Sequence, residues 1–371
     1  MTVNAPASAT IQRFPGLDGV RAVAVLIVFF GHAPGTNVLP GPAGVTLFFF
    51  LSGFLITTLL RLEATHTGLV SLRSFYLRRL LRIVPPLLVA VVLAILADAV
   101  GIVTDRWNAT GLLSSLFFFN NYYIAFAHDP GGTLNTLPLW SLAVEEHFYL
   151  LFPLLYVGLR RRLPSPRQQG VVLLGLCLIV LAWRFVLAFG LHVHGLYLFL
   201  ATDSRVDEIL AGCALALMAN PVLGEWPGRI RVDRLWPIAV VLFCASAKYG
   251  SFTLAGVGRP TFQLGLMAVL FAAVLTGSQS GPLKILNAAP VRWLGRVSYS
   301  FYLVHDLVLR TLKEHAHSSP LIVLSGLVIT LALAGVMHEL IEKPSNRLRH
   351  RLDRVPLAAG EAPTRREPLS G

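Results

Sequence analysis

Charge is the scarcest property of this sequence. Only 13% of its 371 residues are charged and 55% are hydrophobic, with a mean hydropathy of +0.67, whereas a soluble domain carries about 25% charged residues. The composition excludes an ordinary soluble domain and indicates a multi-pass membrane protein. Cysteine is also rare. Because Cys177, Cys213 and Cys244 all fall in apolar segments, we expect buried thiols rather than a disulfide framework.

Motifs of several other functions are missing. The sequence has no P-loop, no glycine-rich dinucleotide fingerprint, no His-Glu-x-x-His motif and no Cys/His spacing typical of a metal site. We therefore expect no metal and no tightly bound cofactor. The formal net charge of +12 arises from cations in short segments between apolar runs. We expect the lipid bilayer, not nucleic acid, to be the partner of these cations.

Apolar runs near the roughly 20 residues needed to cross a bilayer recur along the chain. The sequence predicts an all-α, polytopic membrane helix bundle with about ten transmembrane helices. A shorter apolar segment, residues 111–125, is expected to be interfacial or re-entrant. The predicted spans are 17–35, 43–62, 83–102, 140–160, 169–190, 204–219, 235–248, 259–277, 297–312 and 319–341.

The distribution of Lys and Arg orients this bundle. With the N-terminus inside, the segments that face the cytoplasm contain most of the cations, which is the asymmetry of the positive-inside rule. We therefore expect both termini to be cytoplasmic. The predicted outer segments contain only Arg106, Lys248, Arg259 and Lys313.

The first and last apolar runs set the expected limits of the membrane domain. A single transmembrane domain is predicted over residues 17–345, in a multi-pass protein of the cell membrane. Residues 1–16 are expected to be a disordered cytoplasmic tail, and residues 346–371 a tail that is first basic and then disordered. The first apolar span shows no convincing small-residue cleavage site, so we expect no cleavable signal peptide.

Ionisable side chains within predicted spans indicate function, because charge is costly inside a bilayer. The first span carries Arg21 and His32. Their separation places them on one helix face, about 16 Å apart along the axis. A lone histidine at such a position often only hydrogen-bonds nearby backbone, but a second ionisable group on the same face favours a functional site.

Two motifs follow at the second and third spans. Ser52 and Gly53 interrupt an aromatic run, and small residues allow close packing of membrane helices; we expect this notch to pack against the first span. Arg79 and Arg82 share a helix face at the cytoplasmic mouth of the third span. Guanidinium groups suit phosphate recognition, while ordinary topology and contact with lipid headgroups are the alternative.

Two glutamates and a histidine open the fourth span at its outer end. Glu145 is expected near the level of His32, where a carboxylate can fix the imidazole tautomer and stabilise its protonated form. Adjacent helical residues diverge by about 100°. Glu145 and Glu146 therefore cannot both face the same partner, and an interfacial, solvated carboxylate is the alternative for one of them.

Polar groups also occur in three later spans. Arg205 and Glu208 are spaced to pair along the sixth span, beside Asp207, as a structural ion pair or as part of a site. Glu342-Lys343-Pro344 is expected to end the last span. The ninth span contains a polar stripe at three- and four-residue spacing, formed by Ser298, Tyr302 and His305. These residues could bind a substrate, and hydrogen bonding between helices is the alternative.

In this order the motifs resemble those of the acyltransferase type 3 family of integral membrane acyltransferases. The resemblance covers about residues 15 to 345. The matching segments are Arg21 to His32, Ser52 to Ile56, Arg79 to Pro85, Trp140-Ser141-Leu142 with Glu145 and Phe148-Tyr149, Arg205 to Asp207, Gly295 with Ser298-Tyr299, Tyr302-Leu303 with His305, and Glu342 to Pro344.

The resemblance implies transfer of an acyl group, often acetyl, from acyl-coenzyme A to a hydroxyl group of a carbohydrate, glycan or secondary-metabolite acceptor. Acyl-coenzyme A would be a co-substrate rather than a bound cofactor. The resemblance gives catalytic roles to His32, as the base, with Arg21 and Glu145, and places Arg79 and Arg82 on the acyl-donor side. The residues then expected to bind substrate or to be structural are Ser141, Arg205, Asp207, Ser298, Tyr302 and His305.

A proton- or solute-coupled transporter is the main alternative, because buried Arg, His and Glu also build relays. Such a transporter is expected to show internal repeats and broken helices in matching halves, and we find neither in the sequence. A non-catalytic membrane scaffold would have little reason to place polar groups on three spans at one depth.

Overall fold

The computed structural model describes residue 14 and residues 16–35, 41–104, 107–127, 138–226, 234–246, 254–277, 281–315 and 319–354. Within these ranges every regular element is helical and no strand occurs, which confirms the predicted all-α class. The elements are α1 (Leu17–His32), α2 (Gly41–Thr67), α3 (Leu72–Ala99), α4 (Ala109–Leu116), α5 (Asn120–Ala127), α6 (Leu139–Arg162), α7 (Pro166–Phe185), η2 (Val186–Gly190), α8 (Gly195–Leu200), α9 (Thr202–Met218), η3 (Pro221–Leu223), α10 (Trp236–Ser246), α11 (Leu254–Gly277), η5 (Pro282–Asn287), α12 (Ala289–His315), α13 (Ser319–Met337), η6 (His338–Glu342) and α14 (Lys343–Arg354).

In the described part of the chain, 7 helical segments are long and apolar enough to cross a membrane. They contain α2, α3, α6, α7, α9, α11 and α13 and coincide with predicted spans. The other three predicted spans coincide with α1, which has 16 residues, with α10, which has 11, and with the mixed polar and apolar α12. The total of about ten spans and the cytoplasmic location of the termini stay predictions.

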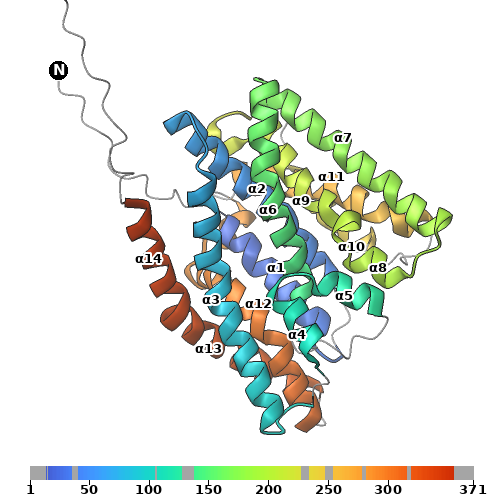
Figure 1. Ribbon diagram of the computed structural model, residues 1–371, viewed down its shortest axis with the longest axis vertical. Coiled ribbons are helices and arrows are strands. Elements are labelled where there is room, and N and C mark those ends of the chain that lie inside the picture. The colour runs from blue at the N-terminus through green and yellow to red at the C-terminus, as the bar shows by residue number, and fades with distance from the viewer. Residues whose placement is uncertain are drawn as a thin grey trace, which may run out of the picture.

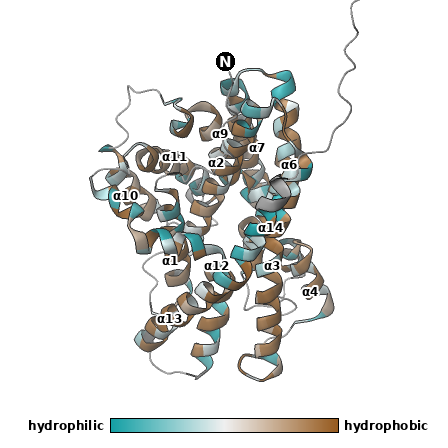
Figure 2. Cartoon of the chain, turned by 90° about the vertical axis from the view of Figure 1, so that its left-hand side faces the viewer, coloured by the Kyte–Doolittle hydropathy of each residue, from teal (hydrophilic) through white to brown (hydrophobic). Residues whose placement is uncertain are grey.

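Helix α1 lies in the middle of the bundle, packed between α2 and α12 (Figure 1). Helix α9 packs on α2 and α7, and α13 packs on α12. Apolar residues cover most of α3 and α13 (Figure 2). On α3 the side chains of Leu88, Val92 and Leu96 are exposed, as expected for a helix that faces lipid.

The end of the last span differs from the prediction. The chain does not leave the helix at Pro344: a π-helical turn, η6, leads directly into α14. Proline is tolerated in the first turn of a helix, where its missing N–H is not needed. Part of the segment expected to be a tail is thus a basic helix that packs against α3, while residues 1–13 and 355–371 lie outside the described residues.

Glycine lets α2 pack backbone against backbone on its neighbours. A Cβ atom at Gly53 would overlap the carbonyl oxygen of Ile209 on α9, and Gly212 of α9 makes the reciprocal approach to α2. The notch at Gly53 therefore packs against α9, not against the first span as predicted. The first span meets α2 at Gly44 instead, where a Cβ atom would overlap the carbonyl oxygen of Ala24.

We expect Gly53→Ala to lower the thermal unfolding temperature of the detergent-purified protein by several degrees. The added methyl group forces α2 and α9 apart, and overpacking of this kind costs about 1–3 kcal/mol. The matched control is Gly175→Ala on α7, where a Cβ atom would meet nothing within 4 Å and alanine favours the helix. Equal stability of the two variants would show that the close approach at Gly53 is not needed.

Candidate functional site

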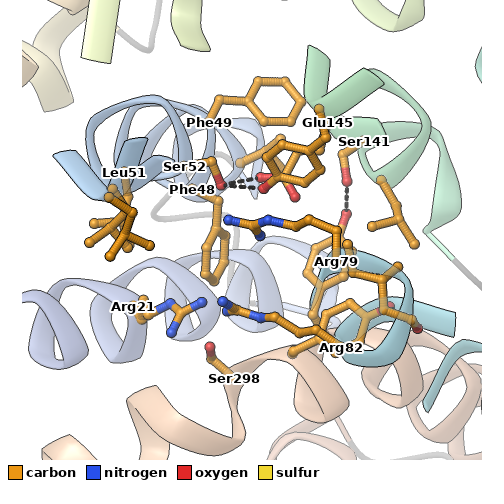
Figure 3. Close-up of a pocket in the computed structure, with 18 residues that line it drawn as sticks. Arg21, Phe48, Phe49, Leu51, Ser52, Arg79, Arg82, Ser141, Glu145 and Ser298 are labelled. Carbon is orange, nitrogen blue, oxygen red and sulfur yellow. Dashed lines mark hydrogen bonds between the residues drawn. The ribbon is translucent and has the colours of Figure 1, made fainter. Parts of the chain in front are cut away.

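A pocket opens between α1, α2, α3, α6 and α12 and contains about 870 Å³ of space between atoms, part of it open to the outside. Its wall combines apolar side chains of α2 with charged and hydroxyl groups of the other four helices (Figure 3). We call it the arginine pocket. The predicted site residues that line it are Arg21, Arg79, Arg82, Ser141, Glu145, Ser298 and Tyr302.

Close packing of α12 on α1 positions one wall of this pocket. A Cβ atom at Gly295 would overlap the backbone of Asp18, so only glycine allows the two helices to come this close. Arg21 and Ser298, each three residues further along their helices, then lie beside each other in the wall (Figure 3).

Helix α3 supplies Arg79 and Arg82 just before a Pro-Pro pair that interrupts its backbone hydrogen bonding. The hydroxyl of Tyr299 on α12 donates to the carbonyl oxygen of Ile83 at 2.9 Å. This bond ties α3 to α12 beside the pocket, so both arginines are held on its wall.

Three guanidinium groups converge in the arginine pocket. Arg79 lies over the ring of Tyr149, with Cζ 4.3 Å from the ring centroid. Arg21 and Arg82 point toward each other (Figure 3), and Nε of Arg21 is buried with no hydrogen-bond partner among the described residues. Because like charges repel at short range unless an anion compensates them, the pocket is suited to an anionic group.

Glu145 is the only acidic side chain among the described residues that line the arginine pocket. Ser52 donates to Oε1 of Glu145 at 2.6 Å, and Tyr149 donates to Oγ of Ser52 at 3.0 Å. One carboxylate thus stands against three guanidinium groups, which leaves the pocket positively charged.

His32 lies at the far end of α1 from Arg21 and is exposed. Its Nδ1 is 2.9 Å from the carbonyl oxygen of Val28 and 3.4 Å from Nε2 of His305. Since a carbonyl oxygen only accepts, Nδ1 of His32 carries a proton, and Nε2 of the neutral ring keeps its lone pair. His305 is fixed in the same way, because its Nδ1 is 2.7 Å from the carbonyl oxygen of Tyr302.

The expected contact between His32 and Glu145 is not formed: the hydrogen bonds of these two described side chains go to other partners. Tyr302 lies between the two regions. It lines the arginine pocket, its hydroxyl is 2.5 Å from that of Ser141, and its ring centroid is 5.6 Å from that of His305. The rings of His305 and His32 are 5.1 Å apart, so Tyr302 and His305 connect the pocket to His32.

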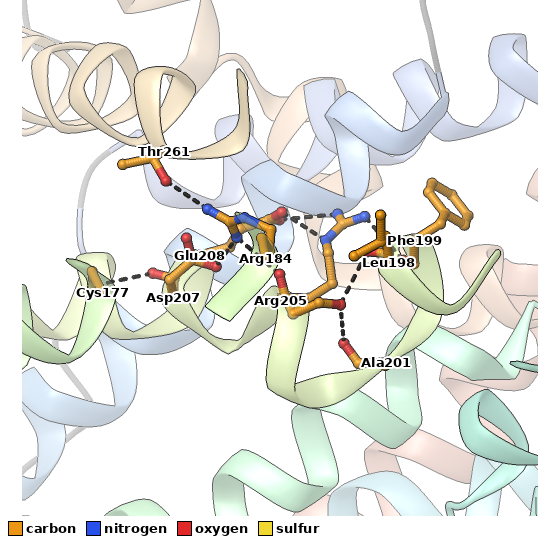
Figure 4. Close-up of polar contacts among 10 residues, drawn as sticks. Cys177, Arg184, Leu198, Phe199, Ala201, Arg205, Asp207, Glu208 and Thr261 are labelled. Atoms are coloured by element: carbon orange, nitrogen blue, oxygen red, sulfur yellow. Dashed lines mark hydrogen bonds and ion pairs between the residues drawn. The ribbon is translucent and has the colours of Figure 1, made fainter. Parts of the chain in front are cut away.

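Arg205 and Asp207 lie in a separate, buried polar cluster (Figure 4). Nε of Arg205 is 2.7 Å from Oε1 of Glu208, which confirms the predicted pair along one helix. Asp207 accepts from Arg184 of α7 at 2.8 Å, and Arg184 also donates to Thr261 of α11. Because the bonds of Arg184 join α7, α9 and α11, they favour a structural role for Asp207, whereas the pair of Arg205 and Glu208 stays within α9.

A second, more polar cavity adjoins the arginine pocket and contains about 1310 Å³ of space between atoms, part of it open to the outside. The two share Arg21, Arg82, Ser298 and Tyr299. We call this cavity the vestibule. The sequence analysis did not predict the vestibule, although the basic residues that follow Pro344 could have indicated it. Besides the shared residues, its lining consists of Trp293, Arg296, His338, Glu339, Glu342, Lys343, Asn346, Arg347 and Arg349. Among the described residues, no group of three or more His, Cys, Asp or Glu side chains is placed to hold a metal ion.

Apolar helices around a positively charged pocket define a multi-pass protein of the cell membrane. The family model described as "Acyltransferase domain" (Acyl_transf_3) matches residues 14–339. The chain belongs to this acyltransferase family, as its motifs indicated. No solved structure matches the chain.

Relatives of the chain carry O-acetyltransferase names. It is 29% identical over 308 residues to the peptidoglycan O-acetyltransferase OatA of Listeria monocytogenes, covering 78% of this chain and 48% of OatA. It is 30% identical over 353 residues to YrhL of Bacillus subtilis, which is named as a putative peptidoglycan O-acetyltransferase. This match covers 89% of this chain and 54% of YrhL. The chain thus spans about half the length of these curated relatives.

Proposed function

We propose that the protein is an acyl-coenzyme A-dependent O-acyltransferase, which transfers an acyl group, in the first place acetyl, to a hydroxyl group of a carbohydrate, glycan or secondary metabolite. The observation that carries this proposal is the convergence of Arg21, Arg79 and Arg82 on an apolar-walled pocket. Guanidinium groups bind phosphate oxygens in forked geometry. Coenzyme A presents phosphates at one end and an acyl thioester at the other, so it matches a pocket that is cationic on one side and apolar on the other.

The donor would enter from the side predicted to be cytoplasmic. Arg21 and Arg82, at the junction with the vestibule, would hold phosphates near the start of α1. His32 lies about 16 Å further along this helix, a distance that an extended pantetheine arm spans. Arg21 therefore takes a donor-binding role in the proposal, and the reacting carbonyl carbon lies toward His32.

The reaction needs a base for the acceptor hydroxyl, and Nε2 of His32 is the candidate. It accepts the hydroxyl proton while the oxygen attacks the thioester carbonyl carbon. A C–O bond forms, the C–S bond breaks, and the coenzyme A thiolate leaves and takes up a proton. Histidine is the side chain that most often acts as a general base, which suits this step. His305 and the Val28 carbonyl oxygen support it by keeping the proton of His32 on Nδ1.

The relatives support a glycan acceptor. OatA is named for peptidoglycan, whose sugars carry free hydroxyl groups. The exposed position of His32 at the predicted outer end of α1 is compatible with an acceptor that reaches the protein from outside the cell.

Incubation of membranes containing the protein with radiolabelled acetyl-coenzyme A and peptidoglycan fragments tests this function. We expect label in the acceptor and release of free thiol in equal amounts, because each transfer breaks one thioester. Membranes without the protein are the control. Uptake of a solute into sealed vesicles, with the thioester intact for every acceptor offered, would support the transporter alternative and reject the enzyme.

A further inference from the structure

We propose that the vestibule binds the 3′-phosphorylated adenosine diphosphate end of the acyl donor, and that Arg296 and Arg347 contact its phosphates. This inference rests on the proposed function and adds to it the location and the binding residues of the nucleotide. Helix α14, which the sequence alone presented as part of a tail, becomes one wall of the donor site.

Continuity of the two cavities is the first support. The vestibule and the arginine pocket share Arg21 and Arg82. A ligand that fills both would place a bulky, polar end in the larger cavity and a thin, apolar arm in the smaller one. Coenzyme A has this division, with its nucleotide at one end and pantetheine at the other.

The balance of charge in the vestibule is the second support. Its acidic side chains already have partners: Glu339 binds Lys343 at 2.5 Å, and Glu342 accepts from Ser300 at 2.5 Å and lies 2.7 Å from His338. Arg296 and Arg347 form no hydrogen bond or ion pair within the described residues, although Arg347 lies near enough to Glu339 for its charge to act on this carboxylate. These cations are therefore available to a ligand with several phosphate groups.

An aromatic side chain completes the site. Trp293 is 37% exposed and lines the same cavity, one turn before Arg296 on α12. Indole rings stack on nucleobases. A cavity that offers both guanidinium groups and an indole face fits a nucleotide better than inorganic phosphate.

Donors of decreasing size provide the test. Acetyl-coenzyme A, its 3′-dephospho form and acetyl-pantetheine carry the same thioester but progressively less of the nucleotide. For the wild-type protein we expect kcat/KM to fall at each truncation. Arg296→Ala and Arg347→Ala should each lower kcat/KM for acetyl-coenzyme A about tenfold or more and leave kcat/KM for acetyl-pantetheine unchanged. The matched control is Arg292→Ala, because Arg292 is an exposed cation on α12, like Arg296, but does not line the vestibule. This variant should leave kcat/KM for all three donors unchanged.

Several outcomes would overturn the inference. Equal use of all three donors by the wild type, or an equal loss with every donor in the variants, would show that the vestibule does not hold the nucleotide, while acyl transfer itself would stand. If the wild type used none of the donors, the proposed function would fail together with this inference. The kinetics should be repeated in nanodiscs of phosphatidylcholine with and without phosphatidylglycerol. A variant effect seen only with the anionic lipid would assign these arginines to lipid headgroups instead.

Discussion

Replacement of His32 by alanine is expected to reduce acyl transfer at least about 100-fold, because a positioned general base contributes roughly 10²–10⁴-fold to the rate of such a step. The protein should still fold and insert, since the side chain of His32 is exposed and its hydrogen bonds go only to the carbonyl oxygen of Val28 and to Nε2 of His305. The measurement is label transfer from acetyl-coenzyme A at saturating donor, normalised to the amount of folded protein.

His66→Ala is the matched control, because His66 is also an exposed histidine but lies near the end of α2, away from both cavities. It should retain full activity. Added imidazole should restore part of the activity of His32→Ala by supplying the missing base. Full activity of His32→Ala without imidazole would exclude His32 as the base.

Part of the polar site could be predicted from the sequence, because charged residues are rare in membrane-spanning segments and are easily recognised there. Arg21 and Glu145 stand out as ionisable side chains in apolar spans. Arg79 and Arg82 stand out as an arginine pair on one helix face at the mouth of a span, and all four residues line the arginine pocket. The fold class followed from composition in the same way. Both predictions depend only on the residues within one helix, and these can be read directly from the sequence.

Contacts between helices were harder to predict. Depth in the membrane placed Glu145 near His32, but depth does not determine helix rotation or which helices are neighbours. In the structure Glu145 meets Ser52, and His305 occupies the position next to His32. The glycine notch at Gly53 had the same ambiguity, because a small residue indicates close packing without identifying the partner.

The last helix shows a different limit. A proline near the end of an apolar run indicates either the end of one helix or the first turn of the next, because its missing N–H is harmless in both places. At Pro344 the second possibility holds, and a basic helix follows. The vestibule was missed for this reason.

Glu145→Gln is expected to have two large effects that follow from the arrangement of charge in the arginine pocket. Without ligand the variant should be destabilised by about 1–3 kcal/mol, since the half-buried carboxylate loses its charge-assisted hydrogen bond from Ser52 and no longer offsets the three guanidinium groups. Coenzyme A should then raise the unfolding temperature of the variant by more than it raises that of the wild type. The reason is that Arg21, Arg79 and Arg82 would be left with no carboxylate in the pocket lining, and the phosphates of the ligand would compensate them.

The same variant separates the structural assignment of Glu145 from the one expected from the sequence. If Glu145 acts only on the arginines, the pH dependence of kcat should match that of the wild type, because His32 keeps its partners Val28 and His305. If Glu145 supported His32 directly, loss of its negative charge would change the pH dependence of kcat relative to that of the wild type. Glu146→Gln, which changes the adjacent carboxylate that does not line the pocket, is the control for both measurements. An equal effect of coenzyme A on the wild type and Glu145→Gln would show that no phosphate of the donor lies among these arginines.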